Sequence, residues 1–283
     1  MRAQRWQCPA DDGETIHLAV VGEGPPMIFL HGWTSSRQEW LPYGKQVADL
    51  RQVFCWDARA HGGHPLSNAT PPSVQRLARD LHEVIAHFRL RPVLMGHSMG
   101  ALIIWEYLRH WGCDDLAGLC LVDQSPKLVT DEQWRLGIYE DFSAERNAAF
   151  IQEMHADFAE AVLRLAANGR NPRIAASYQR NSAAIQVLRK YLRTQNAEAL
   201  IALWESFCVA DYREVLERIS VPTLLIYGGA STFYSQATAH YVKGHIPRAV
   251  LRIYEDADHS PHLWQPQRFV DDLRAFLLSP GMA

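Results

Sequence analysis

One stretch of the chain constrains the fold more than any other. An apolar run, Pro92-Val-Leu-Met95, leads into Gly96-His-Ser-Met-Gly100, and an apolar, helix-like segment continues to Trp105. Glycines two positions before and after Ser98 are typical of a very tight strand-to-helix turn, where a side chain would collide with backbone. Such a turn lifts the serine hydroxyl out of a sheet and places the Met99 amide at a helix N-terminus, where it can stabilise an oxyanion. A plain strand-to-helix turn is the alternative interpretation.

The composition is that of an ordinary globular protein. The 283 residues are 48% hydrophobic and 21% charged, which suffices for one large α/β domain with an insertion. The formal net charge is −3 and no basic run stands out, so we expect neither nucleic acid nor a membrane surface as a partner. No segment approaches transmembrane length, and residues 1–8 lack a signal-peptide core. These features predict a soluble, cytoplasmic protein that acts on a small molecule, and they predict no oligomeric state.

The five cysteines are scattered without the C-x-x-C spacing of a zinc site. Cys55 and Cys120 lie inside apolar, strand-like runs. We therefore expect buried thiols in a reducing compartment, with no disulfide framework, no metal site and no cofactor.

Strand-like and helix-like patterns alternate along most of the chain. Besides the strand before Ser98, apolar runs predict strands at 17–21, 27–30, 51–56, 118–122, 222–227 and 249–254. Helical spacing is found at 74–88, after the Gly96–Gly100 motif, and at 269–277. This alternation predicts an α/β fold with a mostly parallel, doubly wound sheet, whose ligand crevice lies at the carboxyl ends of the strands.

The pattern changes after Pro126 and becomes helical without a strand candidate until about Ala210. Thr130-Asp-Glu-Gln133 has the pattern of a capping box, and a long helix-like stretch from Ser143 ends at Asn168-Gly169. We predict a core of residues 1–126 and 211–283 with an inserted helical lid, or cap, of residues 127–210. Large aromatic residues of the lid favour an apolar or aromatic substrate, among them Trp134, Tyr139, Phe142, Phe150, Phe158, Trp204 and Phe207.

A nucleophilic serine needs a general base that is oriented by a third group. Among thirteen histidines, His259 is the best placed, because it follows the last predicted strand at the sheet edge where Ser98 also lies. Four other histidines are assigned other roles: His31, His61 and His97 as structural residues inside turns, and His262 as part of the pocket wall.

Four motifs together resemble the α/β-hydrolase superfamily: His31-Gly-Trp33, Asp57-x-Arg-x-His-Gly62, Gly96-His-Ser-Met-Gly100 and Asp258-His-Ser-Pro-His262. The resemblance covers nearly the whole chain outside the lid. It implies the α/β-hydrolase fold, with Ser98 as the nucleophile and His259 as the base of a catalytic triad. The backbone amides of Trp33 and Met99 would form the oxyanion hole.

The acid of the triad departs from the usual pattern. Most members of the superfamily carry it in a G-x-x-D loop after the penultimate strand, but here that loop is Gly228-Gly-Ala-Ser231. Asp123 ends the strand after the elbow helix, a position that some members use for the acid. An aspartate there can also form the loop by bonding amides near Ser125. With the usual position vacant we predict Asp123 as the acid, with Asp256 and Asp258 second.

The predicted function is a serine hydrolase that cleaves a carboxylic ester or related acyl substrate through an acyl-enzyme. One alternative is a cofactor-independent dioxygenase of the same fold, because the quinolone ring-cleaving members also place the acid after this strand. That enzyme would use a His259–Asp123 dyad as a base on a 3-hydroxy-4-quinolone-like ring, with the serine secondary. A non-catalytic ligand-binding homologue is a further alternative, disfavoured by the intact Ser98 and His259. An aspartate nucleophile, as in dehalogenases and epoxide hydrolases of this fold, is excluded by Ser98.

Overall fold

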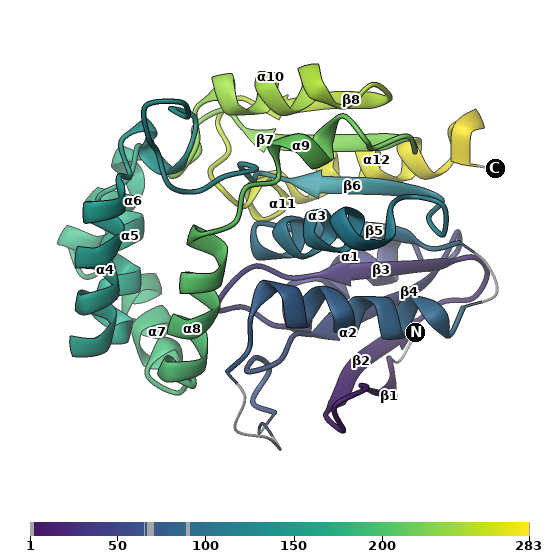
Figure 1. Ribbon diagram of the computed structural model, residues 1–283, viewed down its shortest axis with the longest axis horizontal. Coiled ribbons are helices and arrows are strands. Elements are labelled where there is room, and N and C mark those ends of the chain that lie inside the picture. The colour runs from purple at the N-terminus through teal and green to yellow at the C-terminus, as the bar shows by residue number, and fades with distance from the viewer. Residues whose placement is uncertain (1–2, 65, 67–70, 89–90, 283) are drawn as a thin grey trace.

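A computed structural model describes residues 3–64, 66, 71–88 and 91–282 of the chain (Figure 1). The predicted core begins at residue 1 and ends at residue 283, which both lie outside the described residues. The strands are β1 (Gln4–Pro9), β2 (Thr15–Val21), β3 (Pro26–Leu30), β4 (Gln52–Asp57), β5 (Val93–His97), β6 (Gly118–Val122), β7 (Thr223–Gly228) and β8 (Ala249–Tyr254). Within the described residues they form a single sheet in the order β1-β2-β4-β3-β5-β6-β7-β8.

The sheet is mostly parallel, as predicted. Neighbouring strands from β4 to β8 in this order run parallel, whereas β2 is antiparallel to both β1 and β4. Strand β1 was not predicted from the sequence, because this edge strand is largely polar and buries only Cys8. All five cysteines are free and buried, in agreement with the predicted buried thiols.

Helices cover both faces of the sheet (Figure 1). They are η1 (Arg37–Glu39), α1 (Leu41–Gln46), α2 (Val74–Ala86), α3 (Met99–Trp111), η2 (Ile138–Glu140), α4 (Ala144–Ala156), α5 (Phe158–Ala167), α6 (Pro172–Gln179), α7 (Ala183–Leu192), α8 (Ala197–Cys208), α9 (Arg213–Leu216), α10 (Gln236–His245), α11 (Pro261–Trp264), α12 (Pro266–Leu277) and η3 (Pro280–Met282). No helix in the described part of the chain is both long and apolar enough to cross a bilayer.

Alternate residues of each buried strand pack into two separate cores. In β3, Ile28 and Leu30 join the core that contains residues of α2 and α3, while Met27 and Phe29 join the core that contains residues of α12. This two-sided burial is the physical basis of the doubly wound arrangement. It also brings the carboxyl ends of the central strands together, since Leu30 pairs with Gly96 across the sheet.

The helices α4 to α8, between β6 and β7, gather beyond the carboxyl ends of the strands (Figure 1). The capping-box prediction at Thr130 is wrong. The Thr130 amide instead donates to the Phe142 carbonyl at 2.8 Å, and this non-local contact overrides the local helix signal. The first helix here, α4, begins after Ser143, and the predicted long helix is interrupted at Asp157, whose side chain caps α5. The predicted end at Asn168 is confirmed.

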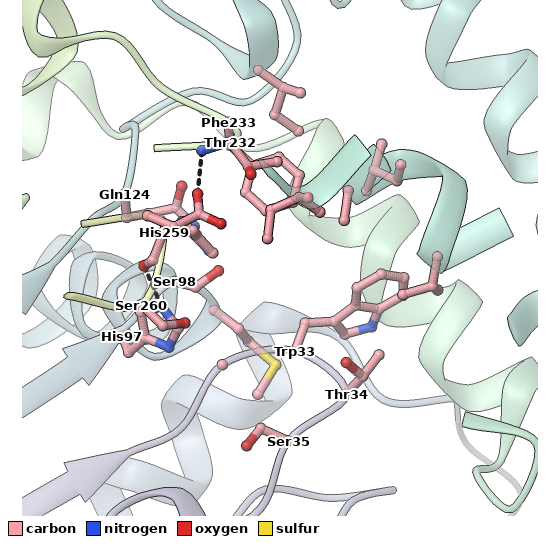
Figure 2. A pocket seen from close by; sticks show the side chains of 18 of the residues that line it. Trp33, Thr34, Ser35, His97, Ser98, Gln124, Thr232, Phe233, His259 and Ser260 are labelled. Carbon is pink, nitrogen blue, oxygen red and sulfur yellow. Dashed lines mark hydrogen bonds between the residues drawn. The ribbon is translucent and has the colours of Figure 1, made fainter. Parts of the chain in front are cut away.

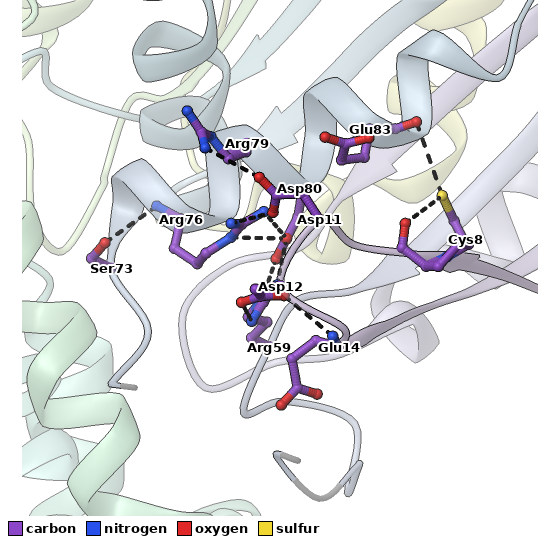
Figure 3. A network of polar contacts seen from close by, with 11 residues as sticks. Cys8, Asp11, Asp12, Glu14, Arg59, Ser73, Arg76, Arg79, Asp80 and Glu83 are labelled. Carbon is purple, nitrogen blue, oxygen red and sulfur yellow. Dashed lines mark hydrogen bonds and ion pairs between the residues drawn. The ribbon is translucent and has the colours of Figure 1, made fainter. Parts of the chain in front are cut away.

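A buried ionic network ties the turn between β1 and β2 to α2 (Figure 3). Arg59 donates to Asp80 at 2.5 and 2.8 Å and to Asp12 at 2.7 Å. Arg76 lies between Asp80, at 2.9 Å, and Asp11, at 2.6 Å. Asp80 is 1% exposed, so its carboxylate is neutralised by guanidinium groups instead of by water.

Candidate active site

The turn between β5 and α3 has the geometry that its sequence predicts. Ser98 has φ 53° and ψ −115°, a strained conformation for a residue with a side chain. A Cβ added to Gly96 would lie 2.4 Å from the backbone of Gly100, and one added to Gly100 would lie 2.4 Å from the Leu30 carbonyl oxygen. Neither contact is tolerable, which explains why both flanking positions are glycine.

His259 and Asp123 are 136 residues apart in the chain and form a hydrogen bond in the structure. The distance from His259 Nδ1 to Asp123 Oδ2 is 3.0 Å, and Asp123 is completely buried at the end of β6. Because the Asp123 carboxyl group contacts Nδ1, the other ring nitrogen, Nε2, is free to accept a proton from Ser98. Ser98 lies beside His259 at the same end of the cavity (Figure 2).

The alternative interpretations of the acid do not match the contacts. The Ser125 amide donates to Gln124 Oε1 at 2.8 Å, not to Asp123. Asp258 accepts from the Thr232 amide at 2.6 Å, and Asp256 is exposed.

The loop at the end of β7, residues 228–231, carries the acid in most members of the superfamily, and here it lies against Asp123. The Ser231 side chain is close enough to counteract the effect of burial on the pKa of the Asp123 carboxyl. Asp123 itself has φ 45°, a left-handed conformation that aspartate tolerates better than most residues. The next residue, Gln124, is held in place because the Tyr227 hydroxyl donates to its carbonyl at 2.5 Å. The carboxyl ends of β6 and β7 therefore lie together beside the carboxylate of Asp123, which contacts His259.

Burial dominates the proton affinities of the pair. It raises the pKa of the Asp123 carboxyl well above its ordinary value. Burial, followed by the nearby His97, lowers the pKa of His259 to about 3. Both shifts disfavour a buried charge, so the imidazole is biased toward its unprotonated form, which can accept a proton.

The two predicted oxyanion amides come from different elements. Met99 is the first residue of α3, where a helix leaves its backbone N–H groups without intrahelical partners. Trp33 follows β3, and its amide has no hydrogen-bond partner among the described residues. The Trp33 ring nitrogen donates to the Leu200 carbonyl in α8 at 3.1 Å, which ties this loop to the helical insertion.

Two of the three histidines predicted to be structural are fully satisfied by backbone groups. His31 contacts the Gly32 carbonyl at 2.8 Å through Nδ1 and accepts from a backbone amide through Nε2 at 3.1 Å. His61 contacts a backbone carbonyl at 2.8 Å and accepts from the Thr34 amide at 3.2 Å. His97 is also buried and has partners on both ring nitrogens.

The prediction that His262 forms part of the pocket wall is wrong. Its side chain is completely buried behind the site, 3.2 Å from Glu39 and with its ring 4.4 Å from that of Trp40. The next two residues, Leu263 and Trp264, line the cavity in its place. His262 is the second residue of the short helix α11, on the buried side of that helix.

The cavity above Ser98 has a volume of about 620 Å³, within the usual range for small-molecule sites. Its far wall is formed by apolar residues of the helical insertion, among them Val162, Leu165 and Ile185. Of the seven aromatic residues of the insertion that were named from the sequence, Trp204 and Phe207 line the cavity. The other five are absent from this wall: Trp134, Tyr139, Phe142, Phe150 and Phe158.

Several lining residues were not predicted. Phe233 meets the His259 ring edge to face at 4.6 Å, and Tyr234 donates to Gln124 beside it. Phe233, Tyr234 and Gln124 all line the cavity, and Figure 2 shows Phe233 and Gln124. The only sequence signal was their location just after strand ends.

Comparisons with known proteins agree with this architecture. A profile of the family described as "Alpha/beta hydrolase family" matches residues 27–272. The chain is 28% identical to a pimeloyl-[acyl-carrier protein] methyl ester esterase of Chromobacterium violaceum over 271 residues, covering 93% of this chain and 98% of that protein. It is 26% identical to a non-heme chloroperoxidase of Kitasatospora aureofaciens, covering 95% and 98% of the two chains.

A solved structure of similar fold is an esterase from Exiguobacterium antarcticum. Its TM-score is 0.81 at 21% identity, over 98% of this chain and 100% of that one. This likeness shows that the two chains share a fold.

Proposed function

The chain belongs to the alpha/beta hydrolase family, and from that premise we propose that it is a serine hydrolase that cleaves carboxylic esters through an acyl-enzyme. The observation that carries the proposal is the hydrogen-bonded His259–Asp123 pair beside a strained, cavity-facing Ser98. The esterases among its relatives support the same reaction class.

The proposed mechanism follows from these positions. The Ser98 oxygen attacks the ester carbonyl carbon while its proton passes to His259. The Trp33 and Met99 amides stabilise the resulting oxyanion, each contributing about 2.7 to 4 kcal/mol by comparison with other acyl-transfer enzymes. His259 then protonates the leaving alcohol, and the acyl group remains on Ser98. A water molecule, deprotonated by His259, attacks the acyl-enzyme and releases the acid. Asp123 holds the imidazole in the tautomer with a proton on Nδ1.

We also propose that the acyl part of the substrate is apolar or aromatic. The wall contributed by residues 158–207 of the helical insertion is lined largely by aliphatic and aromatic side chains. In this proposal residues 127–210 act as the lid of the site and residues 1–126 and 211–283 as its core. No metal or cofactor takes part, and the buried free cysteines support a cytoplasmic location.

A second candidate, the cofactor-independent dioxygenase, is favoured by one observation. Asp123 lies after β6, the position that the resemblance associates with ring-cleaving members. There the His259–Asp123 pair would only remove a proton from a ring hydroxyl, and Ser98 would be dispensable.

The two candidates are distinguished by what Ser98→Ala removes. We expect wild type to hydrolyse members of an aryl ester panel, and both Ser98→Ala and His259→Ala to lose this activity. Ser260→Ala, which also changes a serine lining the cavity, should retain most of it. Oxygen uptake with a 3-hydroxy-4-quinolone that survives Ser98→Ala, together with no ester hydrolysis by wild type, would overturn the proposal in favour of the dioxygenase.

A further inference from the structure

The imidazole of His97, next to the nucleophile in the sequence, is held between two hydrogen-bond acceptors. Its Nδ1 lies 2.8 Å from Glu39 Oε1, and its Nε2 lies 2.9 Å from the His259 carbonyl oxygen. The side chains of His97 and Glu39 are each only 7% exposed. A neutral imidazole has a single N–H, whereas a carboxylate and a carbonyl can only accept. Both contacts are satisfied only when the ring carries two protons.

Two other buried histidines near the site, His31 and His61, provide an internal comparison. His31 and His61 each have one nitrogen facing a backbone carbonyl and the other facing a backbone N–H. One proton satisfies both contacts, so these rings are neutral. Burial also lowers the pKa of both. His97 differs from them in its partners and not in its burial.

We propose that His97 is an imidazolium, paired with a Glu39 carboxylate, that positions the His259 loop and places a fixed positive charge beside the catalytic ring. The charge state stands on the hydrogen-bond pattern alone. Only its effect on catalysis rests on the proposed function.

The Glu39 carboxylate joins three parts of the site. Its Oε1 contacts His97, and its Oε2 accepts from the Gly32 amide at 3.2 Å, one residue before Trp33. His97 in turn holds the backbone of His259. One ion pair therefore links the loop with the proposed oxyanion donor to the loop with the proposed base.

The electrostatic balance agrees with a charged pair. Burial alone would raise the pKa of Glu39, but His97 and His262 together outweigh burial, and the pKa lies well below its ordinary value. Burial would lower the pKa of His97, but Glu39, the His259 carbonyl and Asp123 together outweigh burial, and the pKa is raised. The rings of His97 and His259 have centroids 4.9 Å apart, so a charge on His97 opposes a second one on His259.

Other titratable groups surround these two rings on several elements. They are His31 at the end of β3, Tyr43 in α1, Asp123 after β6, Tyr234 after β7, Asp258 after β8 and His262 in α11. His262 is the one that competes for the charge, since its Nε2 lies 3.2 Å from Glu39. Neither of its ring nitrogens has hydrogen-bond geometry with a described residue, so no contact requires a second proton on this ring, and burial lowers its pKa to about 4.

The charge state can be measured without any substrate. In the full-length protein labelled with ¹⁵N-histidine, and assigned with His97→Gln, His31→Gln and His61→Gln, we expect both His97 nitrogens to be protonated from pH 6 to pH 8. His31 and His61 should each show one protonated and one bare nitrogen. A bare nitrogen on His97 throughout this range would overturn the proposal. So would a stoichiometric metal ion bound by His97, since Glu39, His97 and His262 are also the one group in the described residues that is placed to hold a metal.

The catalytic effect is tested with Glu39→Gln, which keeps the shape of the side chain and its ability to accept from Gly32 but removes its charge. We expect His97 to become neutral in this variant. Loss of this nearby positive charge should raise the pKa of His259. The acid limb of the pH profile of kcat/KM should therefore move to higher pH by about half a unit or more. His97→Gln also loses the contact with the His259 carbonyl and should lower kcat by about tenfold or more.

Tyr43→Phe is the matched control. It removes a hydroxyl that donates to the His262 carbonyl at 2.6 Å, next to the same cluster, without removing a charge. Its acid limb should coincide with that of wild type. An unchanged limb in folded Glu39→Gln would contradict the catalytic part of the proposal. If wild type hydrolyses no ester while His97 is doubly protonated, the proposed function fails and the ion pair stands.

Discussion

At the scale of single residues, the proposed chemistry depends on the 3.0 Å contact between His259 Nδ1 and Asp123 Oδ2. Asp123→Asn keeps the size of the side chain but favours the wrong imidazole tautomer, so we expect kcat to fall by up to about 10⁴-fold. Asp256→Asn is the control, because Asp256 is exposed and close to His259 only in sequence. Equal, mild losses in the two variants would show that the acid lies elsewhere.

The contact between the two strand ends makes a rescue experiment possible. Ser231→Asp in the Asp123→Asn background should restore part of the lost activity, because Ser231 lies beside the Asp123 carboxyl. Ser231→Ala alone should have little effect. Activity assays of the three variants, with circular dichroism to verify folding, check this prediction. A complete absence of rescue in a folded double variant would argue that position 231 cannot reach His259.

The pH dependence follows from His259, which must be unprotonated to accept the Ser98 proton. Activity therefore falls as the pH drops through the pKa of this group. Because burial and the nearby His97 lower that pKa to about 3, we expect the acid limb of kcat/KM to lie well below the ordinary histidine value of about 6.5. The measurement uses an ester without titrating groups and only pH values at which the protein stays folded. An acid limb at pH 7 or above would contradict the proposed state of His259.

At the scale of elements, we expect the helical insertion to determine which acyl groups fit. Ala166 and Val162 lie on α5 and line the cavity. Ala166→Phe should narrow the cavity and shift the preference in kcat/KM toward shorter acyl chains, while Val162→Ala should widen it and shift the preference toward longer ones. A series of 4-nitrophenyl esters of increasing chain length measures both. Shifts in the same direction would mean that this wall does not contact the acyl group.

The buried ionic network under α2 belongs to the same scale. Asp80→Ala leaves two buried or half-buried guanidinium groups without a shared partner, so we expect a loss of about 3 kcal/mol in the free energy of unfolding. Asp11→Ala removes surface ion pairs of Arg76 and Arg79 and should cost less than about 1 kcal/mol. Urea denaturation of both variants measures the difference. Comparable losses would mean that burial of the network has no energetic effect.

Elements with a strong local pattern were predicted from the sequence, and those fixed by distant contacts were not. The bounds of β6 and β8 agree with their predictions, because each is a compact β-prone run between turn residues. Glu39 was not predicted to matter, since it lies in a single 3-10 turn and meets His97 across 58 residues. The helix predicted at Thr130 failed for a related reason, because that segment is fixed by its contact with Phe142.

At the scale of the whole molecule, the two-sided core and the helical insertion together build the site at the carboxyl ends of the strands. The turn that carries Ser98, the end of β6 and the loop after β8 meet there, and α4 to α8 lie beyond them (Figure 1). Ser98 and His259 were predicted from the sequence because each follows a readable strand, and Asp123 because the superfamily resemblance implies an acid at that strand end when the usual position is vacant. Their mutual contacts, and the side chains that support them, depend on packing that the sequence pattern does not encode.

In the proposed mechanism Ser98 becomes covalently bonded to the acyl group. Labelling with a fluorophosphonate, followed by peptide mass spectrometry, detects this bond formation at the serine itself. We expect one adduct per chain, located on Ser98, absent in Ser98→Ala and retained in Ser35→Ala, which changes another serine that lines the cavity. An adduct on a different residue, or no adduct on a protein that hydrolyses esters, would contradict the proposed mechanism.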